Sequence, residues 1–480
     1  MDRENYVSPF SRRYASAEMQ YIFSEEKKFR TWRKLWIALA RAEKNCGLPI
    51  SDEQIAELEA NRDNINYDDA EMREAACRHD VMSHIYAYGL LCPNAAGIIH
   101  LGATSCYVAD NTDIMLMKEG LELICSKLAA VISQLSEFAL EYKSIPTLAY
   151  THLQPAQLTT VGKRAALWIN EFVLDLNELK SRKDTLLLLG CKGTTGTQAS
   201  FLELFAGDLA KIDEMERQIA KEVGFSGCVP VSGQTYSRKT DYYVLSALSG
   251  FAQSASKFAS DIRLLSSFKE IEEPFESSQI GSSAMPYKRN PMRCERISSL
   301  SRYLICDTLN PALTAASQWF ERTLDDSANK RISVAEAFLA ADSILNILLD
   351  VSLNLAVYPE VIKRRVMAEL PFMATENILM HAVSLGGSRQ ELHEKLRVHS
   401  QAAARLIKEE GKENDLIDRI CADSDFGISK DEALKLLDPK LYTGRSAEQT
   451  ERFINDTVMP ILSDFEKSDT AKWARRRLEV

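Results

Sequence analysis

Four polar, glycine-containing segments hold most of the side chains that could do chemistry. Segments of this kind carry binding and catalytic residues more often than the buried faces of helices do. In the first, residues 100–113 (HLGATSCYVADNTD), the hydroxyl groups of Thr104 and Ser105 beside Gly102 could donate hydrogen bonds to a carboxylate. The alternative interpretation is an ordinary helix N-cap, for which these residue types are also preferred.

The second segment, residues 150–160 (YTHLQPAQLTT), places His152 shortly before Pro155, where we expect a helix to begin. A histidine there could give or take a proton near neutral pH, although a lone histidine is more often structural. The third segment, residues 190–200 (GCKGTTGTQAS), lacks the Gly-Lys-Ser/Thr end of a P-loop and the preceding strand of a dinucleotide fingerprint. A nucleoside triphosphatase is therefore disfavoured.

The fourth segment, residues 279–296 (QIGSSAMPYKRNPMRCER), is the most informative. Two serines follow Gly281, and a proline stands on each side of the pair Lys288 and Arg289. The segment is too polar for a core and too irregular for a helix, so we expect a loop. A basic loop is either solvated surface or a binding segment for an anion.

A cationic cluster follows at residues 319–331 (WFERTLDDSANKR), where Arg322, Lys330 and Arg331 surround Ser327. Guanidinium groups match phosphate and carboxylate oxygens in a two-pronged geometry. The alternative is surface ion pairing, because two aspartates lie in the same segment. Similar groups occur at Arg13, Tyr14, Arg78, His79 and Asp80.

The composition limits the possible partners. The 480 residues carry a net charge of −10, so the chain lacks the basic character of a nucleic-acid binder, and an anionic ligand needs a local cationic cluster. No run of 18 apolar residues predicts a membrane span, and the first residues have no apolar export segment. Ten scattered cysteines without a CxxC pair are typical of free thiols in a reducing compartment.

The chemistry-bearing segments must be positioned by long helices. Glycine and proline total 20 + 14 = 34 residues, which is few for a chain of this length, so turns are scarce. Apolar residues recur at helical spacing over 23–59 (two helices, the second near Ser51), 111–142, 156–189, 237–268, 291–319 and 333–357. Only 228–232 could be extended. We therefore expect an all-α chain of three helical domains, at 1–104, 105–357 and 358–480, with a central bundle of five long helices.

Residues 281–290 (GSSAMPYKRN) match the signature GSSxMPxKxN, and the chain resembles the fumarase/aspartase superfamily of fumarate-releasing lyases. Within it, the chain is similar to the adenylosuccinate lyase family of animal type at the segments RHD, LGATSCYV, THLQPAQLTTVGKR, GTTGTQASF, GQTYSRK and QWFERTLDDSAN. The resemblance runs from about residue 11 to residue 460. It implies a homotetramer with a twenty-helix core and active sites shared between subunits. It also implies that no metal or organic cofactor is required. From the charge, the hydropathy and the cysteines we expect a cytoplasmic enzyme without nucleic-acid or membrane partners.

The resemblance implies β-elimination of fumarate, a carbon–nitrogen lyase reaction of purine biosynthesis. The substrates are adenylosuccinate, which gives AMP, and succinyl-aminoimidazole-carboxamide ribotide. Ser282 would be the general base, His152 the acid that protonates the leaving nitrogen, and Glu295 the carboxylate that orients the histidine. Lys288 would stabilise the carbanion and the serine alkoxide. Sequence alone leaves open whether Ser282 or Ser283 is the base.

The same resemblance assigns substrate-binding residues. The residues implied for the nucleotide and its phosphate are Arg13, Tyr14, Arg78, His79, Asp80, Arg322, Ser327 and Arg331. Those implied for the succinyl carboxylates are Thr104, Ser105, Gln234, Lys288 and Asn290. Arg296 would lie alongside the ligand. The alternatives are another fumarate-releasing lyase, such as argininosuccinate lyase, and a non-catalytic structural protein on the same fold. The phosphate-matching cations favour the nucleotide enzyme.

Cys294 precedes Glu295 and is either a reactive thiol beside the proposed relay or a thiol buried in a helix. We also expect the loop at 279–296 to close over bound substrate and to exclude water.

Overall fold

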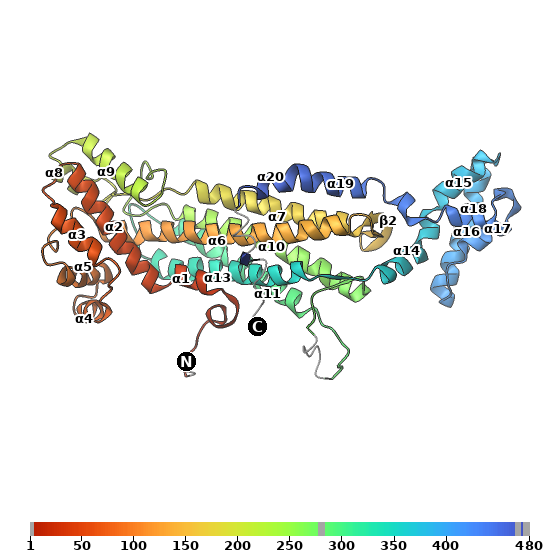
Figure 1. Cartoon of the computed structure of the whole chain (residues 1–480), viewed down its shortest axis with the longest axis horizontal. Helices are drawn as coiled ribbons and strands as arrows, with labels where there is room; N and C mark the ends of the chain where they lie inside the picture. Colours follow the sequence, from red (N-terminus) through yellow and green to blue (C-terminus); the bar gives the residue numbers. More distant parts are fainter. Residues whose placement is uncertain (1–3, 277–283, 466–471, 474–480) are drawn as a thin grey trace.

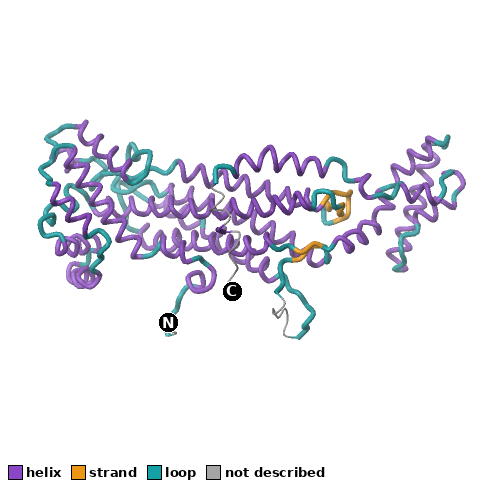
Figure 2. Tube along the Cα trace, viewed as in Figure 1, coloured by secondary structure: helices purple, strands orange, loops and turns teal. Residues whose placement is uncertain are grey.

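The computed structural model describes residues 4–276, 284–465, 472 and 473 as an elongated, mainly helical molecule (Figure 1). Long helices run along its middle, and shorter helices form the two ends (Figure 2). The fold is therefore all-α, as the scarcity of turn residues predicts.

Four long helices and the shorter α11 (Met292–Asp307), which has 16 residues, pack against one another in the middle of the molecule. The long helices are α6 (Ser105–Glu141), α7 (Val161–Asp184), α10 (Lys239–Phe268) and α13 (Asp326–Leu353). α6 and α13 bury apolar residues on more than one side, whereas the buried apolar residues of α11 lie along a single stripe. At Gly120, a Cβ would lie 2.7 Å from the ring of Phe338, so glycine allows α6 and α13 to approach closely.

The N-terminal helices form one end of the molecule (Figure 1). Ahead of them in the chain is η1 (Phe10–Tyr14), which packs on α13. The helices that follow are α1 (Ala17–Ile22), α2 (Glu25–Asn45), α3 (Asp52–Ala60), α4 (Tyr67–Cys77) and α5 (Asp80–Leu91). Two later helices, α8 (Ala199–Leu204) and α9 (Leu209–Glu222), lie at the same end. Ser24 and Ser51 cap α2 and α3, and Ser51 does so in a full capping box. The two helices expected over 23–59 are thus confirmed.

The C-terminal helices form the opposite end (Figure 1). They are α14 (Pro359–Met373), α15 (Thr375–Ser384), α16 (Arg389–Glu410), α17 (Leu416–Ala422), η2 (Ser424–Phe426), α18 (Lys430–Lys435) and η3 (Pro439–Tyr442). The chain then returns along the bundle as α19 (Ser446–Phe453), η4 (Ile454–Val458) and α20 (Met459–Leu462), with α19 against α7.

A β-hairpin precedes α7, and the sequence did not predict it. Strands β1 (Pro146–Thr151) and β2 (Gln154–Thr160) pair antiparallel, so the helix expected from residue 156 begins only at Val161, after the cap residue Thr160. A second short pair joins β3 (Ile271–Glu272) to β4 (Ala356–Val357). Around 228–232, the only bridge within the described chain pairs Cys228 with Leu188.

The expected helix over 291–319 is interrupted. It consists of α11 and α12 (Leu309–Ser317), which meet at Thr308. Pro311 explains the break, because it has no N–H to donate to the carbonyl of Asp307 one turn earlier.

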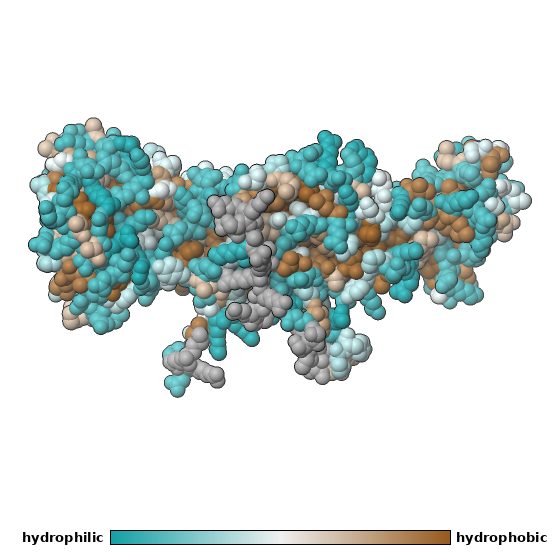
Figure 3. Space-filling view, viewed as in Figure 1, coloured by the Kyte–Doolittle hydropathy of each residue, from teal (hydrophilic) through white to brown (hydrophobic). Residues whose placement is uncertain are grey.

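Two helices, α6 and α13, are long and apolar enough to cross a membrane by length and hydropathy. In the fold, 72% and 78% of their most apolar windows are buried, so they act as the core helices of the bundle. On the face drawn in Figure 3, hydrophilic side chains predominate at the N-terminal end, and hydrophobic ones appear between them along the bundle.

Candidate functional site

A cavity of about 450 Å³ opens where the N-terminal helices meet the first turns of α6 and α13. Its lining also includes residues of α2, the junction of α4 and α5, and the segment before α10. Residues far apart in the sequence therefore meet at this end of the bundle. Among those predicted from the sequence, the lining includes Arg78, His79, Asp80, Ser105, Arg322, Ser327 and Arg331.

The Arg78–His79–Asp80 triplet forms the turn between α4 and α5. Arg78 ends α4 in the left-handed conformation, with φ 54°. His79 is the N-cap of α5, and its Nδ1 accepts a hydrogen bond from the backbone of Met82 at 3.3 Å. Asp80 accepts from the backbone of Val81 at 2.8 Å. The turn presents a cation, an imidazole and a carboxylate to one wall of the cavity.

The N-terminus of α6 forms a second wall. Thr104 occupies the N-cap position, but its hydroxyl caps no backbone amide, and Ser105 is the first helical residue. The N-terminus of this 37-residue helix carries partial positive charge and unpaired N–H groups, which favour a bound anion. The N-cap interpretation thus holds for the position of Thr104 and not for its side chain.

Gln234 and Arg322 meet at Cys106. The Cys106 thiol lies 3.6 Å from Gln234 Oε1, and Arg322 Nη1 lies 2.8 Å from Cys106 Sγ. The backbone N–H of Gln234 also donates to the carbonyl of Glu321 at 3.0 Å. Burial raises the pKa of Cys106 to about 12, so the thiol stays protonated here.

The first turns of α13 supply Ser327 and Arg331. Arg331 Nη2 lies 3.9 Å from Asp80 Oδ2, which connects α13 with the α4–α5 turn. The guanidinium is largely exposed to the open cavity.

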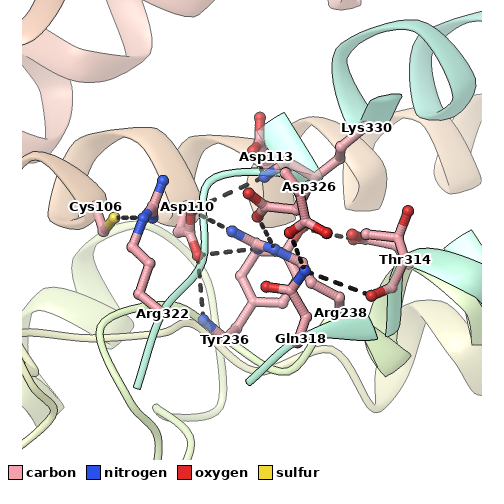
Figure 4. A network of polar contacts seen from close by, with 12 residues as sticks. Cys106, Asp110, Asp113, Tyr236, Arg238, Thr314, Gln318, Arg322, Asp326 and Lys330 are labelled. Atoms are coloured by element: carbon pink, nitrogen blue, oxygen red, sulfur yellow. Dashed lines mark hydrogen bonds and ion pairs between the residues drawn. The ribbon is translucent and has the colours of Figure 1, made fainter. Parts of the chain in front are cut away.

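A buried ionic network lies beneath these residues (Figure 4). Arg238 donates to both carboxylate oxygens of Asp110, at 3.0 and 3.2 Å, and to Asp326 at 2.6 Å. Lys330 pairs with Asp113 and lies 3.9 Å from Asp110. The side chain of Asp326 is 1% exposed, so the surface ion pairing considered for this segment is wrong for Asp326.

His152 lies far from this cavity. It occupies the tip of the β1–β2 hairpin, with φ 54° and an exposed side chain. The hairpin follows the C-terminal end of α6, whereas the cavity surrounds its N-terminal end (Figure 1). At about 1.5 Å per residue, this helix of 37 residues separates them by roughly 55 Å. The expected position at the start of a helix is wrong.

A third location carries the remaining described residues. Lys288 is exposed and Asn290 half-buried in the segment before α11, Glu295 is exposed in its first turn, and Arg296 follows. The guanidinium of Arg296 lies 5.5 Å from the ring of Tyr14, the last residue of η1, and Arg13 precedes it. Ser282, Ser283 and Gly281 lie outside the described residues. The chain thus distributes the predicted residues that the structure describes over three separate places.

Residues 13–305 match the family model described as Lyase, and residues 371–453 match that described as Adenylosuccinate lyase C-terminus. The chain is 52% identical to the adenylosuccinate lyase of Saccharomyces cerevisiae over 469 residues, which cover 97% of each chain. It is 47% identical to that of Schistosoma mansoni (96% of this chain, 97% of the relative) and 31% identical to that of Pyrococcus abyssi (94% and 97%). The chain belongs to the adenylosuccinate lyase family.

Solved structures agree on the fold. A 3-carboxy-cis,cis-muconate lactonizing enzyme from Pseudomonas putida superposes with a TM-score of 0.79 at 21% identity, covering 97% of this chain and 99% of that one. A fumarate lyase from Mesorhizobium gives 0.77 at 21% identity, covering 93% and 99%.

Sequence reasoning missed two cations of the site in this family member. Arg238 stands in the quoted segment GQTYSRK, four residues after Gln234, and only its complete burial reveals its role as a link between carboxylates. Lys28 lines the cavity from α2. The sequence pattern that could have pointed to Lys28 is its spacing: it precedes the buried Trp32 by one helical turn, and therefore lies on the inward-facing side of α2.

Cys294 is not the reactive group considered from the sequence. It is buried in α11, and its backbone N–H donates to Glu273 Oε2 at 2.8 Å. Burial raises the pKa of the thiol well above its ordinary value. The interpretation as a helix-buried thiol is confirmed.

Proposed function

We propose that the chain is an adenylosuccinate lyase, which eliminates fumarate from adenylosuccinate to give AMP and from succinyl-aminoimidazole-carboxamide ribotide to give the carboxamide ribotide. The observation that carries this proposal is the 52% identity to an adenylosuccinate lyase over 97% of both chains. The cavity agrees with it, because four arginines line a space large enough for a nucleotide: Arg78, Arg238, Arg322 and Arg331.

In the proposed reaction, Ser282 as an alkoxide removes the Cβ proton of the succinyl group. The electron pair passes to the adjacent carboxylate, giving a dianionic carbanion equivalent. The pair then forms the fumarate double bond as the Cα–N bond breaks, and His152 protonates the leaving nitrogen. Glu295 orients the imidazole and Lys288 stabilises the added negative charge.

The hydroxyl groups of Thr104 and Ser105 would hold the succinyl carboxylates at the N-terminus of α6, together with Gln234 and Asn290. Support comes from the fixed partial charge of this helix terminus and from the absence of a capping bond to Thr104 within the described first turn. Fixed donors reduce the barrier because they need no rearrangement when charge develops.

The active sites of this proposal form between subunits of a homotetramer. The separation of the His152 hairpin from the cavity supports this, since one chain alone cannot bring the acid to the bound substrate. Neighbouring bundles that run antiparallel would place the hairpin of one subunit against the cavity of another. We also propose the three-domain division at 104/105 and 357/358, and a cytoplasmic location, which ten free thiols support.

The direct test compares release of fumarate from adenylosuccinate and from argininosuccinate by the purified protein. Activity on argininosuccinate alone would contradict the proposal. Ser282→Ala and Ser283→Ala, assayed side by side, identify the base: the variant that loses activity while it still binds AMP has lost the base.

Shared sites are tested by mixing. Ser282→Ala and His152→Ala, inactive alone, should regain partial activity after co-refolding, because some sites in mixed tetramers contain both intact groups. No recovery in verified mixed tetramers would contradict the sharing of this pair.

Closure of the loop that carries Lys288 predicts that AMP and fumarate together slow tryptic cleavage at Lys288 and Arg289.

A further inference from the structure

Lys28 lies on α2 and lines the cavity, although nothing in the sequence pattern assigned it to the site. The lining around it includes Arg78, Ser327 and Arg331. Lys28 therefore belongs to the part of the cavity wall formed by the N-terminal helices, and it shares the cavity with the first turns of α13.

Aromatic rings hold the side chain of Lys28 in place. Its Nζ lies 4.8 Å from the ring of Trp32 and 5.0 Å from that of Phe29. Trp32 is 1% exposed and Phe29 is also buried, so the rings are fixed by the core. Cation–π contacts of this kind orient an ammonium group without neutralising its charge.

The ammonium of Lys28 has no carboxylate within ion-pair distance among the residues that the structure describes. The carboxylates of Asp80, Asp113 and Glu25 lie beyond ion-pair distance and raise the pKa of Lys28. The positive charge of Arg331 lowers it. Burial is the main cause that lowers the pKa of Lys28 below its ordinary value. Two other lysines, unlike Lys28, have a carboxylate partner: Lys27 pairs with Glu119 at 2.7 Å, and Lys330 pairs with Asp113.

A partly buried cation without a close counter-ion is unfavourable until an anion arrives. Lys28, Arg331 and Ser327, which carries a hydroxyl group, line the same cavity. Two cations and a hydroxyl donor suit a phosphate monoester, which carries nearly two negative charges. A lysine serves such a group as a point charge that needs no particular orientation.

We propose that Lys28 is a further substrate-binding residue whose ammonium contacts the phosphate of the nucleotide beside Arg331. This inference rests on the proposed function. It assigns Lys28 to the phosphate and not to the succinyl carboxylates.

The test uses the intact enzyme with Lys28→Met, which keeps an unbranched apolar stem against Trp32 and Phe29 and removes the charge. Lys28→Arg keeps the charge, and Lys27→Met is the matched control, because Lys27 adjoins Lys28 on α2 and pairs outside the cavity. Calorimetry measures the binding of AMP, adenosine and fumarate to each variant, and steady-state kinetics give kcat and KM for adenylosuccinate.

For Lys28→Met, we expect AMP affinity to fall at least tenfold, adenosine affinity to stay within twofold, and KM to rise more than kcat falls. Lys28→Arg should keep most of the affinity, and Lys27→Met all of it. Unchanged AMP affinity in Lys28→Met overturns the proposal, as does an equal loss for adenosine. A selective loss for fumarate overturns the assignment to phosphate.

A second measurement is independent of the variants. AMP should protect Lys28 of the wild-type enzyme from amine acylation, detected by peptide mass spectrometry, while Lys27 reacts at the same rate with and without AMP. Absence of protection at saturating AMP contradicts the proposal. A wild-type protein that neither binds AMP nor cleaves adenylosuccinate would instead contradict the proposed function itself.

Discussion

Lys127 and Asp342 form an ion pair whose side chains are both 0% exposed, between α6 and α13. The pair also holds the segment that follows η1. Asp342 Oδ2 accepts from the backbone N–H of Ser16 at 2.6 Å, and Lys127 donates to Ser16 Oγ at 3.2 Å and to Asn346 Oδ1 at 2.8 Å. Asn346 Nδ2 in turn donates to the carbonyl of Tyr14 at 3.0 Å. A buried charge pair thus fixes the backbone next to two proposed nucleotide-binding residues.

Replacing one member of this pair should destabilise the fold and release the N-terminal segment. Lys127→Met leaves Asp342 charged and buried, and breaking a buried pair in this way typically costs about 3–5 kcal/mol. Urea unfolding measures the loss, and trypsin should cut sooner at Arg13. The double variant Lys127→Met/Asp342→Leu should recover part of the stability. A single variant as stable as the wild type would contradict the argument.

Arg238 is predicted to be a positioning residue. It links Asp110 in α6 to Asp326 at the start of α13, and Ser327 follows Asp326 directly. Arg238→Met leaves two buried carboxylates facing each other, so the first turns of α6 and α13 should move apart. Displacements of about 1 Å can reduce rates by roughly 10²-fold.

The measurement for Arg238 is kcat/KM on adenylosuccinate, with unfolding followed in parallel. Arg217→Met is the matched control, because Arg217 pairs with Glu214 on α9, and neither lines the cavity. A structural role alone predicts lower stability with normal kcat/KM in the fraction that remains folded, and that result would contradict positioning. Arg238→Lys should keep part of the activity, since one ion pair can re-form.

The sequence predicted helices well where apolar spacing is regular and poorly where buried polar residues begin a helix. The helix expected from Asn111 starts at Ser105, because Asp110 and Asn111 are buried partners of Arg238 and of the Gly190 backbone rather than loop residues. The helix expected from Ser333 starts at Asp326 for the same reason. These polar first turns line the cavity, so the site itself obscured the helix boundaries.

Other parts of the site depend on tertiary geometry that spacing does not contain. The hairpin at His152 was missed because Pro155 next to a long apolar pattern resembles the first turn of a helix. The distance between His152 and the cavity follows from the length and direction of α6, which the sequence gives only in part. Lys28 was missed because a lysine on an amphipathic helix is usually solvated.

Glu43 predicts a pH dependence of stability. Its side chain is 0% exposed in α2, and neither carboxylate oxygen has a hydrogen-bond partner in the structure. Burial raises the pKa of Glu43 from its ordinary value of 4.5 to about 9. Between these values the folded state holds a proton that the unfolded state has lost, so the free energy of unfolding falls as pH rises from about 4.5 to about 9.

Glu43→Gln should remove this dependence, because the amide does not titrate. We expect the variant to gain stability relative to the wild type at pH 8.5 and to gain less at pH 5.5, as measured by urea unfolding at both values. Glu203→Gln, at an exposed position of α8, is the control and should show the same pH dependence as the wild type. A difference between Glu43→Gln and the wild type that does not change with pH would contradict a buried, protonated Glu43.

Cys77 should be the first thiol of the site region to react. It is exposed at the end of α4, next to Arg78 of the cavity wall, and a hydrogen bond with Ser83 at 3.3 Å lowers the pKa of its thiol. Cys294 is buried, with its pKa raised. Brief treatment with iodoacetamide at pH 7.5, followed by peptide mass spectrometry, should modify Cys77 well before Cys294, since the thiolate is the reacting species.

Ser83→Ala should slow the modification of Cys77 and leave that of the exposed Cys306 unchanged. Equal rates at Cys77 in the wild type and in Ser83→Ala would show that exposure alone, and not the hydrogen bond to Ser83, sets its reactivity.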